Sequence, residues 1–170
     1  MKALFAHRRA VSLAAGLFCF ALFGYALYAQ YHLGHEPCPL CIFERVAIVA
    51  LGVVLLLAAI PAERQLVLRR IAALAVLVVG ASGVGIATRH VYIQSLPPDK
   101  VPVCGATLDY MFDVFPVLDV LRKVLTGSGE CAKIDWTFLG LAMPAWVLIW
   151  ALLLTLLGVA IHWRRGAANG

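Results

Sequence analysis

The residues best suited to chemistry in this chain are two cysteines separated by two residues, with an arginine one helical turn beyond them. Cys38 and Cys41 stand in the segment Pro37–Arg45, where one apolar run has ended and the next begins. Two thiols at this spacing close a small, reducible disulfide ring or bind a metal ion. Arg45 follows four residues after Cys41, so on a helix the two side chains share a face and the cation favours the thiolate.

Two further cysteines, Cys104 and Cys131, lie in a long polar segment. Four cysteines allow three pairings. Proximity favours Cys38 with Cys41, which leaves Cys104 with Cys131. Taken alone, the second pair is most simply a structural cross-link, stabilising the fold by roughly 3–4 kcal/mol on the chain-entropy model. The Cys38–Cys41 ring is too short to restrict the unfolded chain much, so redox exchange or metal binding explains it better.

A zinc site is the metal alternative for the first pair. His32 and His35 precede Cys38 and Cys41 closely enough to complete a set of two cysteines and two histidines. Thiolate ligands in an oxidising compartment are exposed to oxidation, which favours redox chemistry over metal binding. The fifth cysteine, Cys19, lies inside an apolar run and is interpreted as a small buried hydrophobe.

The composition indicates a membrane protein. Hydrophobic residues make up 63% of the 170 residues, charged residues 14%, and the mean hydropathy is +0.92; soluble domains carry about 25% charged residues. The net charge of +5 does not indicate nucleic-acid binding, because the basic residues stand at the ends of apolar runs and form no patch.

Four apolar runs predict an all-α bundle of four transmembrane helices in one domain, residues 1–170. Each run is long enough to cross a hydrocarbon core of about 30 Å. The predicted spans are residues 10–29, 42–60, 71–88 and 139–161, with connecting loops at about 30–41 and 89–138. The first run is longer than a signal-peptide core and no small-x-small cleavage site follows it, so it is predicted to remain as a span.

Positive charges predict the orientation of the bundle. One side holds almost only basic residues, namely Lys2, Arg8, Arg9, Arg64, Arg69, Arg70, Arg164 and Arg165, against a single Glu63. The positive-inside rule places both termini and the short second connection in the cytoplasm and the two long loops outside. All four cysteines beyond Cys19 lie in or beside the outer loops, where an even number of cysteines predicts disulfides.

The second outer loop contains an amphipathic stretch, residues 109–125. Apolar residues recur there at intervals of three and four, and Pro116 is expected to break or kink the helix. Two positions suit such a segment: on the membrane surface, or as a short helix capping the bundle.

A disulfide that accepts electrons needs a further acceptor in order to turn over. The sequence holds no flavin, haem or nucleotide motif. A lipid-soluble quinone would reach Cys41 laterally from the bilayer, and Arg45 would bind its carbonyl oxygen; this is a hypothesis from position.

Over nearly its whole length the chain resembles the DsbB family of bacterial disulfide bond formation proteins. The resemblance rests on several features that occur in the same order and on the expected spans, listed here: Gln30, Pro37–Arg45, Arg89-His90, Cys104, Cys131 and Trp136–Trp146.

The resemblance implies a bacterial inner-membrane thiol:quinone oxidoreductase with two periplasmic loops, the second carrying a short amphipathic interfacial helix. Reduced DsbA, a thioredoxin-like periplasmic oxidase, would attack the Cys104–Cys131 disulfide at Cys104. Electrons would pass to the Cys38–Cys41 disulfide, and Cys41 would deliver them through a charge-transfer adduct to ubiquinone, or to menaquinone. By the same resemblance Arg45, His90, Gln30 and Glu44 belong to the quinone side, and no metal, flavin or haem is expected.

Three other classes remain open from the residues alone. A quinone or epoxide reductase of the reverse direction also joins a four-helix bundle to a Cys-x-x-Cys motif, although there the motif is expected in a later helix. A metal-binding membrane protein would use Cys38, Cys41, His32 and His35. A disulfide-stapled scaffold would show no turnover.

Overall fold

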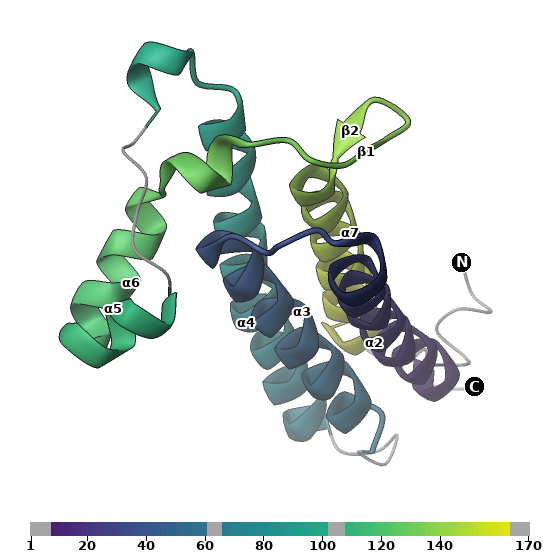
Figure 1. Ribbon diagram of the computed structural model, residues 1–170. Coiled ribbons are helices and arrows are strands. Elements are labelled where there is room, and N and C mark those ends of the chain that lie inside the picture. The colour runs from purple at the N-terminus through teal and green to yellow at the C-terminus, as the bar shows by residue number, and fades with distance from the viewer. Residues whose placement is uncertain (1–7, 61–65, 102–107, 164–170) are drawn as a thin grey trace, which may run out of the picture.

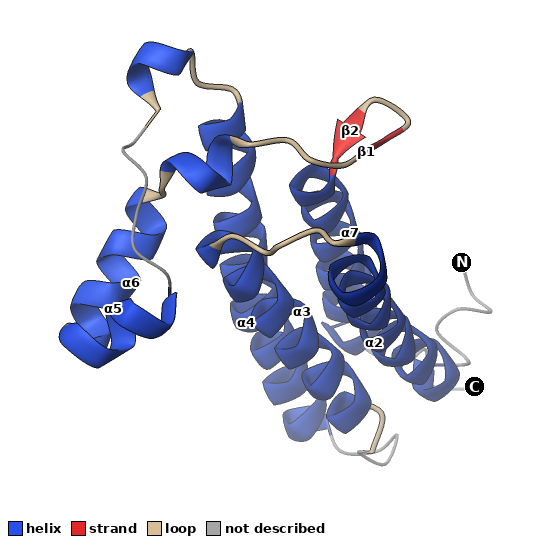
Figure 2. Ribbon diagram, in the orientation of Figure 1, coloured by secondary structure: helices blue, strands red, loops and turns tan. Residues whose placement is uncertain are grey.

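Four long helices dominate the computed structural model, which describes residues 8–60, 66–101 and 108–163 (Figures 1 and 2). They are α2 (Arg8–Leu33), α3 (Pro39–Ala58), α4 (Leu66–Gln94) and α7 (Met143–Trp163). All four are long and apolar enough to cross a membrane. The predicted four-helix membrane bundle is therefore confirmed.

The bundle is built from closely packed helix pairs. Helix α4 lies along α7, α2 lies along α3, and α3 joins the two pairs by packing on α4. The tightest approach is at Gly80 of α4, where a Cβ atom would come within 2.0 Å of the Thr155 hydroxyl on α7. Small residues at such points let helix backbones approach and gain van der Waals contact. The core between the helices includes Leu51, Leu55 and Val76.

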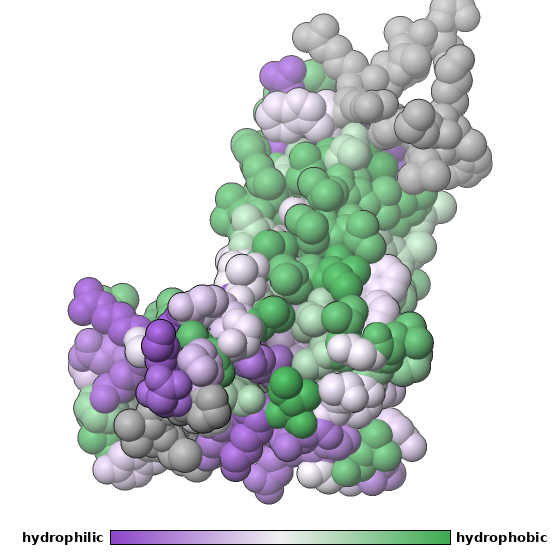
Figure 3. Space-filling view, turned by 90° about the horizontal axis from the view of Figure 1, so that it is seen from above, coloured by the Kyte–Doolittle hydropathy of each residue, from purple (hydrophilic) through white to green (hydrophobic). Residues whose placement is uncertain are grey.

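Leucine and valine side chains also cover much of the outside of the bundle. Figure 3 shows a broad apolar surface over the helices, with polar residues gathered toward the end that carries the longer loops. Exposed examples include Leu17, Leu57 and Val78. In water such a surface would drive aggregation, whereas in hydrocarbon it carries no penalty. The distribution fits a multi-pass membrane protein.

Two helices begin at other residues than the spans predicted at about 42–60 and 139–161. Helix α3 begins at Pro39, not at residue 42, because Pro39 occupies the first helical position and Cys38 caps the helix. The fourth helix begins at Met143, not at residue 139. Residues 137–142 form a hairpin of β1 (Thr137–Phe138) and β2 (Leu141–Ala142). Its turn residues, Leu139 and Gly140, both have positive φ, which a helix does not allow.

The described part of the second outer loop folds into short helices. These are η1 (Pro98–Lys100), α5 (Leu108–Val114), α6 (Val117–Thr126) and η2 (Gly129–Ala132). As predicted, the amphipathic stretch is broken at Pro116, which caps α6.

Helix α6 buries part of its apolar face against the bundle. Val120 and Val124 pack in a cluster with Leu40 of α3 and Ile93 of α4. The Arg89 guanidinium donates to the Leu125 and Thr126 carbonyls, both at 2.9 Å, and so holds the last turn of α6. These contacts favour the helix that caps the bundle. Leu118 and Leu125 remain exposed, so contact with the membrane surface stays a prediction.

Candidate active site

Cys38 and Cys41 face each other at the start of α3. The Cys38 sulfur caps the helix by accepting a hydrogen bond from the Cys41 backbone N–H, and the two Sγ atoms are 3.3 Å apart. Both residues are free thiols in this structure, so the predicted Cys38–Cys41 disulfide stays a prediction. The separation is a hydrogen-bonding contact, and a small side-chain movement brings the sulfurs to bonding distance.

Cys131 joins this pair from the second outer loop. It lies in η2 and is 1% exposed, and its sulfur contacts the Ser128 hydroxyl at 3.5 Å. The ligand atoms of Cys38, His90 and Cys131 all lie within 4.8 Å of one another. The predicted partner of Cys131 is Cys104, which lies outside the described residues. The spacing of the cysteines in the sequence does not predict that Cys131 lies close to Cys38.

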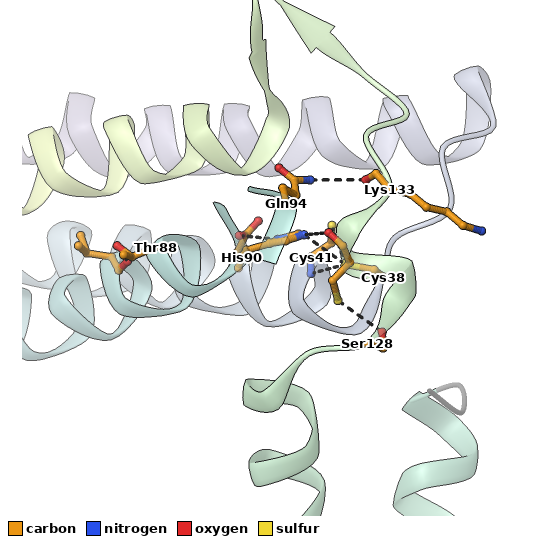
Figure 4. Close-up of polar contacts among 10 residues, drawn as sticks. Cys38, Cys41, Thr88, His90, Gln94, Ser128 and Lys133 are labelled. Atoms are coloured by element: carbon orange, nitrogen blue, oxygen red, sulfur yellow. Dashed lines mark hydrogen bonds and ion pairs between the residues drawn. The ribbon is translucent and has the colours of Figure 1, made fainter. Parts of the chain in front are cut away.

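His90 and Glu44 form a buried pair, and Figure 4 shows His90 beside Cys41 and Cys38. His90 Nδ1 is 2.9 Å from the Glu44 carboxylate, and its Nε2 is 3.6 Å from Cys38 Sγ and 3.2 Å from the Cys131 carbonyl oxygen. The two side chains are 1% and 3% exposed. A carboxylate at this depth needs a partner, and α4 supplies one.

Arg45 and Gln30 link α3 to α2. One guanidinium nitrogen of Arg45 donates to the Gln30 side-chain oxygen, and the other donates to the Ala26 carbonyl at 3.2 Å. Glu44, the neighbour of Arg45 in the chain, pairs with His90 and not with Arg45. Arg45 is thus held in place while remaining part of a cavity wall.

A cavity of about 560 Å³ unites these groups. Its size lies in the range of small-molecule sites, about 300–1,000 Å³. Cys41, Arg45 and His90 line it together with aromatic side chains from the hairpin and α7, including Trp136 and Trp146. Most of its wall is apolar, as in small-molecule sites in general.

The contact between Cys38 and Cys131 polarises the two sulfurs. The hydrogen bond from the Cys38 thiol lowers the pKa of Cys131 to about 5, against the opposing effect of burial; Ser128 contributes in the same direction. The hydrogen bonds that Cys38 makes to Cys131 and to Cys41, together with burial, raise the pKa of Cys38 well above its ordinary value. Cys131 is therefore the thiolate and Cys38 retains its proton.

We expect the Cys131 thiolate to titrate near pH 5, against about 8.5 for an ordinary cysteine. The measurement is the ultraviolet thiolate absorbance of the reduced Cys104→Ser protein, minus that of Cys104→Ser/Cys131→Ser. Adding Cys38→Ala removes the hydrogen-bond donor and should move the midpoint upward. A midpoint near the ordinary value of about 8.5 in the protein that still contains Cys38 would contradict the assignment of Cys131 as the thiolate.

The site also contains ligand types found in zinc centres. Two groups have ligand atoms within 4.8 Å of one another: Cys38 with His90 and Cys131, and Cys41 with Glu44 and His90. A structural zinc ion takes four protein ligands, and each group supplies three. His32 and His35 belong to neither group; the His32 ring instead stacks on Tyr28. Among the described residues, the predicted alternative of two cysteines with these two histidines is not assembled.

Neighbouring sulfurs of unequal acidity support thiol–disulfide exchange. The apolar surface of the bundle indicates that this exchange takes place in a membrane. The fold and the site therefore define the protein as a membrane disulfide oxidoreductase.

Comparison with known proteins is more specific. The chain belongs to the DsbB family, because the family description "Disulfide bond formation protein DsbB" matches residues 8–161. It is 52% identical over 133 residues to disulfide bond formation protein B of Methylococcus capsulatus, which covers 78% of this chain and 80% of that protein. It is 40% identical over 164 residues to the protein of that name from Xylella fastidiosa, covering 96% and 95% of the two chains. The chain thus has a role in disulfide formation, and the predicted family is confirmed.

Proposed function

We propose that this protein is a thiol:quinone oxidoreductase of the bacterial inner membrane. It reoxidises a DsbA-like periplasmic oxidase and passes two electrons through two cysteine pairs to membrane quinone, either ubiquinone or menaquinone. Both termini lie in the cytoplasm in this proposal. Arg9 and Arg70 support that orientation, while several of the basic residues behind it lie outside the described part of the chain.

The observation that carries the proposal is the row of three sulfurs leading to the cavity. Cys131 arrives on the outer loop, Cys38 lies beside it, and Cys41 lies 3.3 Å further on in the cavity wall. Electrons moving by exchange need each sulfur within reach of the next. This order provides a path from a soluble protein partner to a ligand dissolved in the bilayer.

The first steps are exchanges between disulfides. A thiolate of the reduced partner attacks Cys104, the Cys104–Cys131 bond breaks, and Cys131 leaves as a thiolate. Cys131 then attacks Cys38, the Cys38–Cys41 bond breaks, and Cys41 leaves carrying the electron pair. The second thiol of the partner attacks its own sulfur bound to Cys104, so the partner leaves oxidised and Cys104 leaves as a thiolate. Cys104 then attacks Cys131, which restores the Cys104–Cys131 bond and releases Cys38, which takes up a proton. In the first step Cys38 is still in a disulfide and donates no hydrogen bond, so the leaving Cys131 thiolate is stabilised by its contact with the Ser128 hydroxyl.

The residues of the cavity fit a quinone as the second substrate. Its apolar and aromatic wall suits a flat ring with an isoprenoid tail, and Arg45 supplies hydrogen-bond donors for a carbonyl oxygen. Bound quinone supplies the two-electron oxidation. The chain positions the Cys41 sulfur, excludes water with the hairpin and α7, and holds a cation where negative charge develops.

Purified protein tests the proposal directly. Mixing it with quinone and a reduced thioredoxin-like partner should consume the quinone and oxidise the partner in equal amounts. Failure of quinone to accept electrons from the reduced protein would overturn the proposal. Stoichiometric zinc binding by the reduced protein, without turnover, would support the metal-binding class instead.

Replacing Arg45 by methionine should mainly weaken quinone binding. Loss of a donor to a carbonyl oxygen costs about 1–3 kcal/mol, which is roughly a tenfold to hundredfold rise in the KM for quinone. Steady-state kinetics at varied quinone concentration measure it. Arg9→Met is the matched control, because Arg9 donates to the Ala59 carbonyl far from the cysteines. An unchanged KM in Arg45→Met would leave Arg45 only a role in linking α2 to α3.

A further inference from the structure

We propose that His90 is the residue that takes and returns the proton of the Cys38 thiol, and that Glu44 positions it for this role. The assignment rests on the proposed function and goes beyond it, because it directs His90 and Glu44 to the sulfur chemistry instead of to the quinone. The line of contacts runs from the Glu44 carboxylate through both ring nitrogens to Cys38 Sγ, with separations of 2.9 and 3.6 Å.

The carboxylate fixes the tautomer of the ring. Glu44 is an acceptor when ionised, so the proton of neutral His90 lies on Nδ1 and is donated to Glu44. Nε2 then carries the lone pair and faces the Cys38 thiol, whose proton it can accept. The arrangement of sulfur, imidazole and carboxylate follows the logic by which a third group orients a catalytic histidine.

The Cys131 carbonyl favours the protonated ring. It lies 3.2 Å from His90 Nε2 and can accept a hydrogen bond only after Nε2 has gained a proton. The imidazolium is then bonded on both sides, by Glu44 and by a backbone oxygen of the docked second loop. Removal of the Cys38 proton is thereby favoured while Cys131 is in place beside Cys38.

The step balances as follows. The S–H bond of Cys38 breaks, its proton moves to His90 Nε2, and a bond forms between the Cys38 sulfur and the Cys41 sulfur, which enters as a thiolate. The two electrons released reduce the quinone to quinol. As it is reduced, the quinone takes up two protons, one that passes through His90 and one from solvent.

Among the described histidines, only His90 has a ring nitrogen within 4.8 Å of these sulfurs, while His35, Glu36 and Asp135 line the same cavity. The titratable groups that face His90 come from two elements. They are Cys38, Cys41 and Glu44 from the first turns of α3 and its cap, and Cys131 from η2; Arg45, Glu130 and Lys133 line the same cavity.

The test is the reoxidation of pre-reduced protein by quinone, which excludes the exchange with the partner. General-base residues contribute about 10²–10⁴-fold, so His90→Gln should slow this step by about 10²-fold or more. Quinone binding to the non-reacting Cys41→Ser background should stay within about twofold when His90→Gln is added. In the pH profile of the wild-type protein, the reoxidation rate should fall at low pH as His90 becomes protonated. This low-pH limb of the profile should be absent in His90→Gln.

Two further variants separate proton transfer from a structural effect. Glu44→Gln, which disturbs only the orienting partner, should slow reoxidation by about 10–100-fold. In His90→Ala, added imidazole should restore part of the rate. His162→Gln is the matched control, since His162 is a buried histidine that contacts Ser12 at 3.1 Å near the opposite end of the bundle; it should keep the wild-type pH limb.

Docking of the loop is checked independently. In a Cys41→Ser/Cys104→Ser background, an oxidant should join Cys38 to Cys131 whether or not His90→Gln is present. The proposal is overturned if His90→Gln keeps the rate and the pH limb, or if its only effect is weaker quinone binding. It is also overturned if the cross-link is lost, because the histidine then serves only to dock the loop. Failure of wild-type protein to reduce quinone would instead overturn the proposed function.

Discussion

The Cys41→Ser protein should lose quinone reduction entirely, by more than about 10⁴-fold, as expected when the reacting nucleophile of a catalytic unit is removed. Cys41 lines the cavity together with Arg45, one helical turn further along α3. A serine hydroxyl neither ionises near neutral pH nor forms a disulfide. The measurement is the loss of quinone absorbance after mixing with reduced partner.

A matched substitution separates this effect from general damage. Cys19 is also a free cysteine, but it is fully buried among Leu51 and its neighbours in the middle of the bundle. Cys19→Ser should reduce stability somewhat and leave the quinone rate unchanged. If Cys41→Ser retains the wild-type rate, electrons leave the protein by a route that does not pass through Cys41, and the proposed mechanism is wrong.

Replacing Cys131 by serine should stop turnover to a similar extent and trap the partner protein. Cys104 then has no intramolecular partner and attacks the disulfide of an oxidised thioredoxin-like protein. The mixed disulfide persists because no Cys131 sulfur is present to resolve it, and it persists longest with a partner that lacks its own second cysteine, supplied as a mixed disulfide with a small thiol. Non-reducing electrophoresis and mass spectrometry identify the captured protein.

The control for trapping is Cys104→Ser/Cys131→Ser, which should capture nothing. A complex that forms equally well in this double variant would mean that the partner attaches through another cysteine, which assigns the outer exchange step to the wrong residue. Capture of a protein with no thioredoxin-like features would keep the cysteine roles and change the identity of the partner.

Much of the fold follows from patterns that a single sequence contains. The four spans are long apolar runs, and Pro116 breaks the amphipathic stretch because a proline removes a backbone donor. Helix ends were less predictable. Leu139 and Gly140 extend the apolar run of the fourth span, yet their positive φ angles turn the chain into a hairpin.

The site was predictable in its parts but not in its contacts. Cys38 and Cys41 are neighbours in the chain, so their approach is local. Glu44 and His90 stand on different helices, and their pairing depends on how α3 packs on α4. The approach of Cys131 to Cys38 depends on the docking of the second loop, through side chains such as Val120. Sequence spacing carries no information on such long-range contacts.

The cap of α3 has a mechanical consequence. Pro39 fixes the backbone φ immediately after Cys38, and the helix begins there. The main chain of Cys38 is therefore held in place. Its sulfur has Cys41 at 3.3 Å and Cys131 within 4.8 Å. Rotation about the Cα–Cβ bond of Cys38 can turn the sulfur from one partner toward the other while the main chain stays in place. In the proposed mechanism, Cys38 therefore exchanges between Cys41 and Cys131 by turning its side chain, without any movement of the bundle.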